Sequence, residues 1–330
     1  MEVWARRLGS WLIGTSLALR LAGSCMDGKL TNWMQNGEVQ SFLLYLETGR
    51  KVRFSPSLAE NTNFVGESHP PVALLAPAEP VPVFSESDTQ WTPLTNMSNR
   101  SPDLESLLTR PLAWDLQSGE PTVLILHSHA TESYTQAGET YRESGAFRTL
   151  EPDYNMLSVG DQLAEVLSRK GIAVIHDREL HDYPDYNDAY SQSRQSMAFY
   201  LERYPGIRLV LDLHRDASAD LQNQIRPLAN ISGRDTAQLM LVVGTDGSGL
   251  SHPGWQENLS LALKLQVQLE RLAPGITRPI NLRSQRFNQD LSPGALLVEV
   301  GAAGNSRDEA LRAAEILGEA IASLAGGAGK

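Results

Sequence analysis

The feature that most constrains this chain is an alternation of short apolar runs with amphipathic stretches, which begins near residue 121. The first run, "TVLILH" (122–127), is continuously apolar, as in a strand buried on both faces. "NMLSVGDQLAEVLSRKG" (155–171) follows with apolar residues at helical spacing and a glycine at its end. Strands and helices that alternate in this way build a parallel sheet covered by helices, so the pattern predicts an α/β fold.

The alternation continues almost to the C-terminus, where Ser306 is the expected N-cap of the last helix. The remaining predicted strands are 172–177, 207–214, 237–245 and 294–301, and the remaining predicted helices are 187–206, 257–275 and 306–325. We therefore expect a single α/β domain over residues 121–330, with a mainly parallel, helix-covered sheet.

Residues 1–25 have the layout of a signal or membrane anchor. Arg6 and Arg7 precede an apolar run, and small residues follow before Cys25. Arg20 keeps that run shorter than the roughly 20 residues of a comfortable membrane span. We expect an extracytoplasmic protein, either anchored by its N-terminus or released after cleavage or lipidation of the signal. The alternative is an amphipathic N-terminal helix on a cytosolic protein.

Residues 26–120 are predicted to connect this N-terminus to the domain. "WMQNGEVQSFLLYLE" (33–47) has the apolar spacing of an amphipathic helix. From about residue 56 the composition shifts to Pro, Ser, Thr and Asn without a helical or strand period. Such a composition is typical of an extended linker.

Charge and cysteine content exclude some classes of function. The chain carries 28 Lys and Arg against 39 Asp and Glu, a formal net charge of −11. This balance argues against nucleic acid as a partner, because phosphate binding needs a basic face. The single cysteine excludes an internal disulfide and a Cys-rich zinc site. A metal in this chain therefore has to be held by His, Asp or Glu, as in hydrolytic sites.

Potential metal ligands gather where three of the predicted strands end. His127, His129 and Glu132 follow the first strand, His214 ends another, and Glu299 lies near the end of a third. One histidine at a strand end is more often structural than a ligand. Three strands that bring histidine and carboxylate to the same edge of a sheet instead predict a metal site.

The residue types fit a catalytic zinc, which takes three His or carboxylate ligands and keeps a fourth position open for water. His129 and Glu132 are three residues apart, so in a helical turn they lie on one side and hold one ion. A carboxylate on a buried strand is unfavourable unless it is paired, bound to metal or functional, so Glu299 is the candidate general base. The alternative for Glu299 is a structural ion pair with an arginine such as Arg215.

Four blocks carry a family resemblance: "LHSHATESY", "NMLSVGDQLAEVLSRKG", "LDLHRDA" and "NQDLSPGALLVEVGAAGN". Over about 121–325 the chain resembles the stage II sporulation protein P family, part of the zinc-dependent N-acetylmuramoyl-L-alanine amidases. The resemblance implies a Zn²⁺ enzyme that cleaves the sugar–peptide amide of peptidoglycan. Members are also associated with cutting peptide cross-links, and act in engulfment with a sporulation lytic transglycosylase and membrane partners of that machinery.

The resemblance also implies residue roles. His129 and His214 match the zinc histidines, and Glu299 matches the catalytic glutamate. The third ligand is open between Glu132, which we favour, and Glu151, which precedes the next helix as in ordinary amidases. His127 is either a residue behind the ligands that orients them or a satisfied core histidine.

Further expectations concern the substrate. Arg215 is predicted to bind a substrate carboxylate. Asn288, with Gln289 and Asp290, lines the cleft or merely forms the turn before a strand. His176, His181 and His252 are interpreted as ordinary surface or structural histidines. Two other functions remain open: a non-catalytic wall-binding scaffold, and another extracytoplasmic metallohydrolase such as a peptidase or deacetylase.

Overall fold

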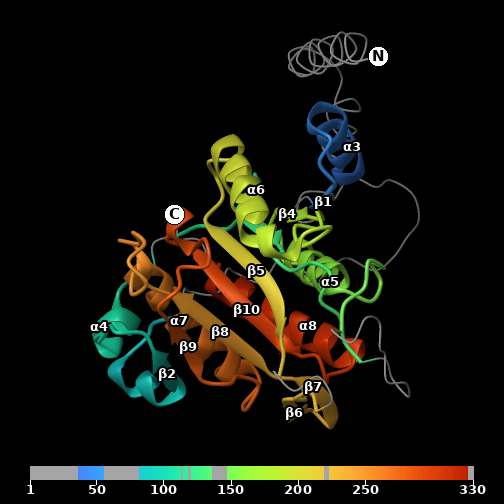
Figure 1. Cartoon of the computed structure of the whole chain (residues 1–330). Coiled ribbons are helices and arrows are strands. Elements are labelled where there is room, and N and C mark those ends of the chain that lie inside the picture. Colours follow the sequence, from blue (N-terminus) through green and yellow to red (C-terminus); the bar gives the residue numbers. More distant parts are fainter. Residues whose placement is uncertain are drawn as a thin grey trace, which may run out of the picture.

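The centre of the molecule is an eight-stranded sheet (Figure 1). This computed structural model describes residues 36–55, 82–112, 114–117, 120–135, 147–218 and 223–325. Its elements are α3 (Gly37–Thr48), β1 (Val52–Ser55), the 3₁₀ helix η2 (Glu86–Trp91), β2 (Leu94–Met97), α4 (Leu104–Thr109), β3 (Val123–Leu126), α5 (Met156–Arg169), β4 (Val174–Asp177), η3 (Tyr186–Asp188), α6 (Ala189–Arg203), β5 (Leu209–Asp216), β6 (Leu228–Ile231), β7 (Arg234–Ala237), β8 (Leu239–Gly244), α7 (Trp255–Leu272), β9 (Ile280–Arg283), η4 (Gln289–Leu291), β10 (Ala295–Ala302) and α8 (Arg307–Leu324).

The strands follow the order β1-β4-β3-β5-β10-β8-β9-β2, and most neighbours are parallel. The antiparallel pairs are β1 with β4 and β10 with β8. The parallel block β4-β3-β5-β10 puts the carboxyl ends of four strands at one edge, where binding sites of α/β sheets form. The predicted α/β class and mainly parallel sheet are confirmed. A separate hairpin joins β6 and β7.

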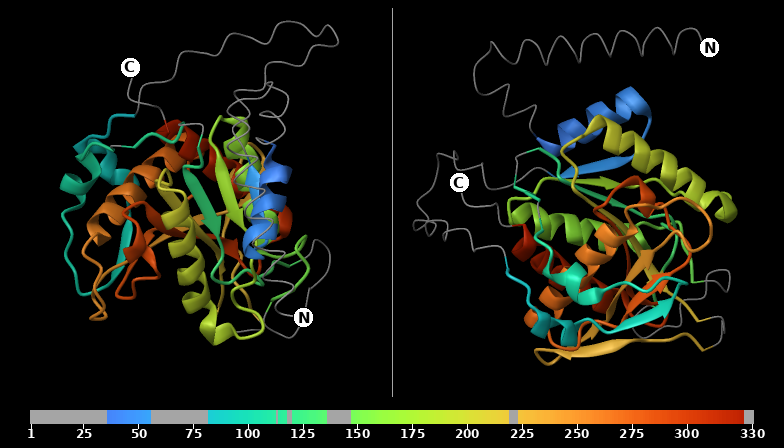
Figure 2. Two further views of the ribbon diagram at one scale, coloured as in Figure 1. Left: turned by 90° about the horizontal axis from the view of Figure 1, so that it is seen from above. Right: turned by 90° about the vertical axis from the view of Figure 1, so that its left-hand side faces the viewer.

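The alternating side chains of strand β5 pack on opposite faces of the sheet. Leu209, Leu211 and Leu213 are buried in the large core that includes residues of α5, α7 and α8. Val210 points to the opposite face, where it packs with residues of α6. Because side chains alternate along a strand, Asp212 and His214 share the face of Val210. The potential ligand on this strand therefore lies on the face that packs with α6. Figure 2 shows this helix, in yellow, in two further orientations.

The predicted helix starts have a clear physical basis. Ser306 caps α8 in a capping box, in which its side chain accepts from the Glu309 N–H and Glu309 accepts from the Ser306 N–H. Asn155 caps α5 by accepting from the Leu157 N–H. Both helices begin within two residues of their predicted positions.

The segment predicted as a linker differs from the expectation where it is described. β1 and β2 close the two edges of the sheet, and α4 buries Leu107 and Leu108 in the large core. These elements have only four to six residues, too few to show a hydrophobic period, and their apolar side chains are buried by partners far along the chain. The predicted helix in 33–47 corresponds to α3. Residues 56–81 lie outside the described part.

The predicted anchor at 1–25 also lies outside the described residues. Among the helices that are described, none combines the length and apolarity needed to cross a membrane.

Candidate metal centre

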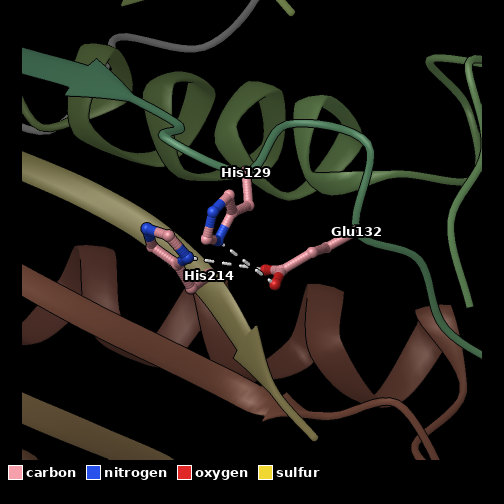
Figure 3. Close-up of side chains that lie close together, drawn as sticks. All are labelled: His129, Glu132 and His214. Atoms are coloured by element: carbon pink, nitrogen blue, oxygen red, sulfur yellow. Dashed lines mark ion pairs between the residues drawn. The ribbon is translucent and has the colours of Figure 1, made fainter. Parts of the chain in front are cut away.

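His129, Glu132 and His214 come together at the carboxyl ends of β3 and β5 (Figure 3). Their ligand atoms all lie within 4.8 Å of one another. Glu132 is at the centre, with Oε1 3.6 Å from His129 Nδ1 and Oε2 3.5 Å from His214 Nδ1. All three residues are largely buried. Two imidazoles and one carboxylate thus converge on one small volume.

The local backbone explains this convergence. β3 ends at Leu126, and a turn follows in which the Glu132 N–H donates to the His129 carbonyl at 3.2 Å. This turn folds the two side chains toward each other. The carboxylate is then fixed from β5, because the Arg215 N–H donates to Glu132 Oε2 at 3.1 Å. The turn therefore brings Glu132 toward His129, and the contact from β5 holds its carboxylate in that position.

Asp212 supports this cluster and was not predicted. It is buried on β5, and its carboxylate accepts from the Ser128 N–H at 2.7 Å and the Ser128 hydroxyl at 2.6 Å. Its Oδ1 also lies 2.9 Å from His214 Nε2, the ring nitrogen that faces away from Glu132. A carboxylate behind a histidine fixes the ring and its tautomer. The signal was present in "LDLH", since residues two apart on a strand share a face.

The electrostatics of the cluster keep the central carboxylate ionised. Burial alone raises the pKa of Glu132, but the charges of Arg215 and His214 outweigh it and lower the pKa to about 2. Burial alone lowers the pKa of His214, but Asp212 and the other neighbours hold it well above its usual value. The pKa of His129 is lowered by burial. An ionised carboxylate therefore sits between imidazoles in a largely buried site.

Glu299 lies on β10 directly opposite His214 of β5. Register partners on neighbouring strands point to the same face, so the Glu299 side chain is directed to the cluster side. The residue keeps some accessible surface, but its Oε2 is buried and has no hydrogen-bond partner in the described part of the chain. Burial raises the pKa of Glu299 to about 8. A carboxyl with a raised pKa next to potential metal ligands fits a proton-transfer group.

Arg215, predicted to bind a substrate carboxylate, makes several contacts inside the protein. It is buried, and its guanidinium donates to the carbonyl oxygens of Ser133 at 3.0 Å and Phe147 at 2.8 Å. Its Nη1 also lies 3.8 Å from Glu132 Oε1. These contacts tie the loop after β3 to β5 and give Arg215 a structural position.

His127 belongs to a separate buried network on the α5 side of the sheet. Its Nδ1 lies 3.1 Å from the Leu213 carbonyl, and its Nε2 lies 2.8 Å from His176 Nε2. His176 in turn contacts Asp161 at 3.0 Å. No contact between His127 and the three clustered side chains is found among the described residues. This placement favours the core role over the orienting role, and burial lowers the pKa of His127 to about 3.

The sequence of the whole domain decides the family. The model of the family "Stage II sporulation protein P (SpoIIP)" matches residues 79–322. The chain belongs to the stage II sporulation protein P family. The match begins upstream of residue 121, in agreement with the position of β2 and α4 within the domain.

Relatives and solved structures show how far this similarity extends. Stage II sporulation protein P of Bacillus subtilis (strain 168) is 25% identical over 276 residues, which cover 80% of this chain and 63% of that protein. Among solved structures, the N-acetylmuramoyl-L-alanine amidase AmiC2 of Nostoc punctiforme has a TM-score of 0.36 and 17% identity, over 63% of this chain and 96% of that chain. The N-acetylmuramoyl-L-alanine amidase of Clostridium difficile 630 has a TM-score of 0.37 and 16% identity, over 64% and 100%.

The two candidates for a third ligand in this family member are placed apart. Glu132 is in the cluster, whereas Glu151 is exposed at the surface before α5. Asn288, predicted to line the cleft, is buried and donates through its amide to the Tyr190 carbonyl at 2.8 Å. Its φ of +59° is in the left-handed region, where asparagine is one of the more tolerated residues. Asn288 therefore holds the start of α6.

The other residues of that block and the remaining histidines also have internal contacts. Gln289 bonds to the backbone of β8, and Asp290 forms an ion pair with Arg194. His176, His181 and His252 are buried and contact Asp161, Asp177 and Asn258, respectively.

Aromatic side chains that were not predicted surround the histidines. The Tyr186 ring stacks on His129 with centroids 4.5 Å apart, and Tyr190 meets the same imidazole edge-on at 5.4 Å. Tyr190 also lies parallel to His214 at 6.4 Å. Both tyrosines come from "PDYNDAY" (184–190), which overlaps the start of the predicted helix 187–206, and only the folded arrangement shows that they meet the histidines.

Proposed function

We propose that this protein is a zinc-dependent peptidoglycan hydrolase that cleaves the N-acetylmuramoyl-L-alanine amide bond during sporulation. The observation that carries the proposal is the His129, Glu132 and His214 cluster with Glu299 on the adjacent strand. Membership of the stage II sporulation protein P family supports the link to sporulation and the wall. Action on peptide cross-links in addition, and cooperation with a lytic transglycosylase and engulfment partners, are part of the same proposal.

The donor set fits zinc. Ligand atoms about 2.0–2.2 Å from a tetrahedral ion are about 3.3–3.6 Å from one another. Oε1 of Glu132 lies 3.6 Å from His129 Nδ1 and Oε2 lies 3.5 Å from His214 Nδ1, close to this spacing. Two histidines and one carboxylate also match the composition of catalytic zinc sites that keep a fourth position open. His129, Glu132 and His214 would hold the ion.

When bound, zinc supplies Lewis-acid chemistry that polarises the scissile carbonyl and makes a water molecule more acidic. The chain itself provides the remaining parts. Asp212 keeps the His214 ring oriented, and Arg215 keeps Glu132 in place. Glu299 accepts a proton from the attacking water and passes it to the leaving nitrogen. To act as a base it has to be ionised, and positive charge in the neighbouring cluster favours that state.

The proposed location is extracytoplasmic, with the N-terminal segment as membrane anchor or cleaved signal. The polymeric wall lies outside the membrane, so this location places the enzyme with its substrate. The acidic composition of the chain agrees with a partner other than nucleic acid.

Mass spectrometry of purified peptidoglycan digested by the zinc-loaded full chain tests the bond assignment. An amidase releases stem peptides that begin with a free L-alanine amine and leaves glycan strands with free lactyl groups. Cuts within the peptides alone would identify a peptidase instead, and loss of acetate alone would identify a deacetylase. An undigested wall that nevertheless binds the protein would identify a scaffold.

A further inference from the structure

Arg148 lies at the rim of the candidate metal centre, next to two of its residues. Its backbone pairs with that of Glu132 in an isolated β-bridge. Its guanidinium carbon lies 3.7 Å from the centroid of the Tyr186 ring, and this ring stacks on His129. Arg148, Tyr186 and His129 therefore form a stack that leads from the surface to a metal ligand.

The guanidinium of Arg148 has no acidic partner in this arrangement. None of the ion pairs among the described residues includes it, and its buried Nε lacks a hydrogen-bond partner there. Stacking uses the flat face of a guanidinium and leaves the in-plane N–H groups free to form a fork with a carboxylate. Tyr186 is 41% exposed, so the stack is open to solvent on its outer side.

Arg215 cannot offer the same chemistry because its N–H groups donate to backbone carbonyls inside the protein. The guanidinium of Arg148 thus keeps hydrogen-bonding capacity that a carboxylate can use. The position one ring away from His129 places that carboxylate close to the candidate metal centre.

We infer that Arg148, supported by Tyr186, is a specificity-determining residue that binds a carboxylate of the peptide part of the substrate. The ligand class is an acidic peptide with a free carboxylate close to the scissile amide. This inference rests on the proposed function for the identity of the substrate, and it deepens that function by assigning the peptide side of the site.

The first experiment measures binding and does not require turnover. Full-length protein with Glu299→Gln and added Zn²⁺ is titrated in a calorimeter with muramoyl-L-Ala-γ-D-Glu-meso-diaminopimelate. A second titration uses the analogue in which the D-Glu carboxylate is amidated. The forked, charged contact predicts about 10- to 100-fold weaker binding of the amidated analogue.

The same pair of peptides is then measured with Arg148 substituted. With Arg148→Gln the two peptides should bind within about threefold of each other, because the partner of the carboxylate is gone. Arg148→Lys keeps the charge but loses the fork and should retain part of the preference. Arg169→Gln, on the exposed side of α5, is the matched control and should keep the full preference. Circular dichroism and melting curves confirm that each variant is folded.

Two results would overturn the inference: equal binding of both peptides to the parent protein, or an unchanged preference after Arg148→Gln. Absence of binding of both peptides at millimolar concentration would overturn it as well. Hydrolysis separates it from the proposed function. If the wild-type chain cuts no wall amide but the preference follows Arg148, the proposed function fails and the inference stands. If the wild-type chain cuts the amide but the two peptides bind equally, the proposed function stands and the inference fails.

Discussion

The buried carboxyl of Glu299 predicts a specific pH dependence of stability in the metal-free protein. Its pKa rises from an ordinary 4.5 to about 8 on folding, chiefly through burial. Between these values the folded chain binds more protons than the unfolded chain, so the free energy of unfolding falls as the pH rises. Replacement of Glu299 by Gln keeps the size of the side chain and removes the ionisation, so the variant lacks this loss.

The magnitude follows from the size of the shift. Each pKa unit corresponds to about 1.4 kcal/mol, so ionisation of Glu299 removes about 4 kcal/mol of stability between pH 5 and pH 9. Part of the side chain is accessible to solvent, which reduces the expected difference to about 2–4 kcal/mol. The Glu299→Gln variant should therefore gain that much stability relative to wild type over this range.

Urea unfolding of both proteins in EDTA, followed by circular dichroism at pH 5, 7 and 9, measures this difference. Taking the difference between the two proteins removes the contributions of groups that titrate equally in both. A constant difference across the range would mean that Glu299 ionises with an ordinary pKa, and the reasoning from burial would be refuted. A difference that shrinks with pH would show that the carboxylate is stabilised by a partner.

Three further predictions address the ligands, their support and the extent of the domain. Glu132→Ala should lose stoichiometric zinc in metal analysis while Glu151→Ala keeps it, and the opposite result would move the third ligand to Glu151. Asp212→Asn should weaken zinc affinity about 10- to 100-fold in competition with a chelator, because it removes the carboxylate behind His214; unchanged affinity would contradict that role. Leu108→Ala should lower the free energy of unfolding by about 2–5 kcal/mol, because α4 is part of the core; a change below about 0.5 kcal/mol would place α4 outside the cooperative unit.

The sequence was sufficient for features that depend on local periodicity. The alternation after residue 121 predicted the α/β class. The histidines and carboxylates at strand ends predicted which side chains meet, since parallel strands bring their carboxyl ends to one edge. His129, Glu132 and His214 were found in this way.

Features that depend on partners distant in sequence could not be predicted. β1, β2 and β9 have four residues each and reveal themselves only through the strands they pair with. The sequence did not show that N–H groups of Arg215 donate to the carbonyls of Ser133 and Phe147. Tyr186 and Arg148 were missed because their contacts with each other and with His129 join segments that are far apart in the sequence.

Zinc reconstitution tests the central claim most directly. The full chain, stripped with EDTA, is titrated with Zn²⁺ while the release of L-alanine-terminated stem peptides from purified peptidoglycan is followed. We predict that release rises linearly and saturates at one zinc per chain, and that Glu299→Gln binds the same zinc without releasing peptide. Release by the stripped protein, or full release by the Glu299→Gln variant, would contradict it.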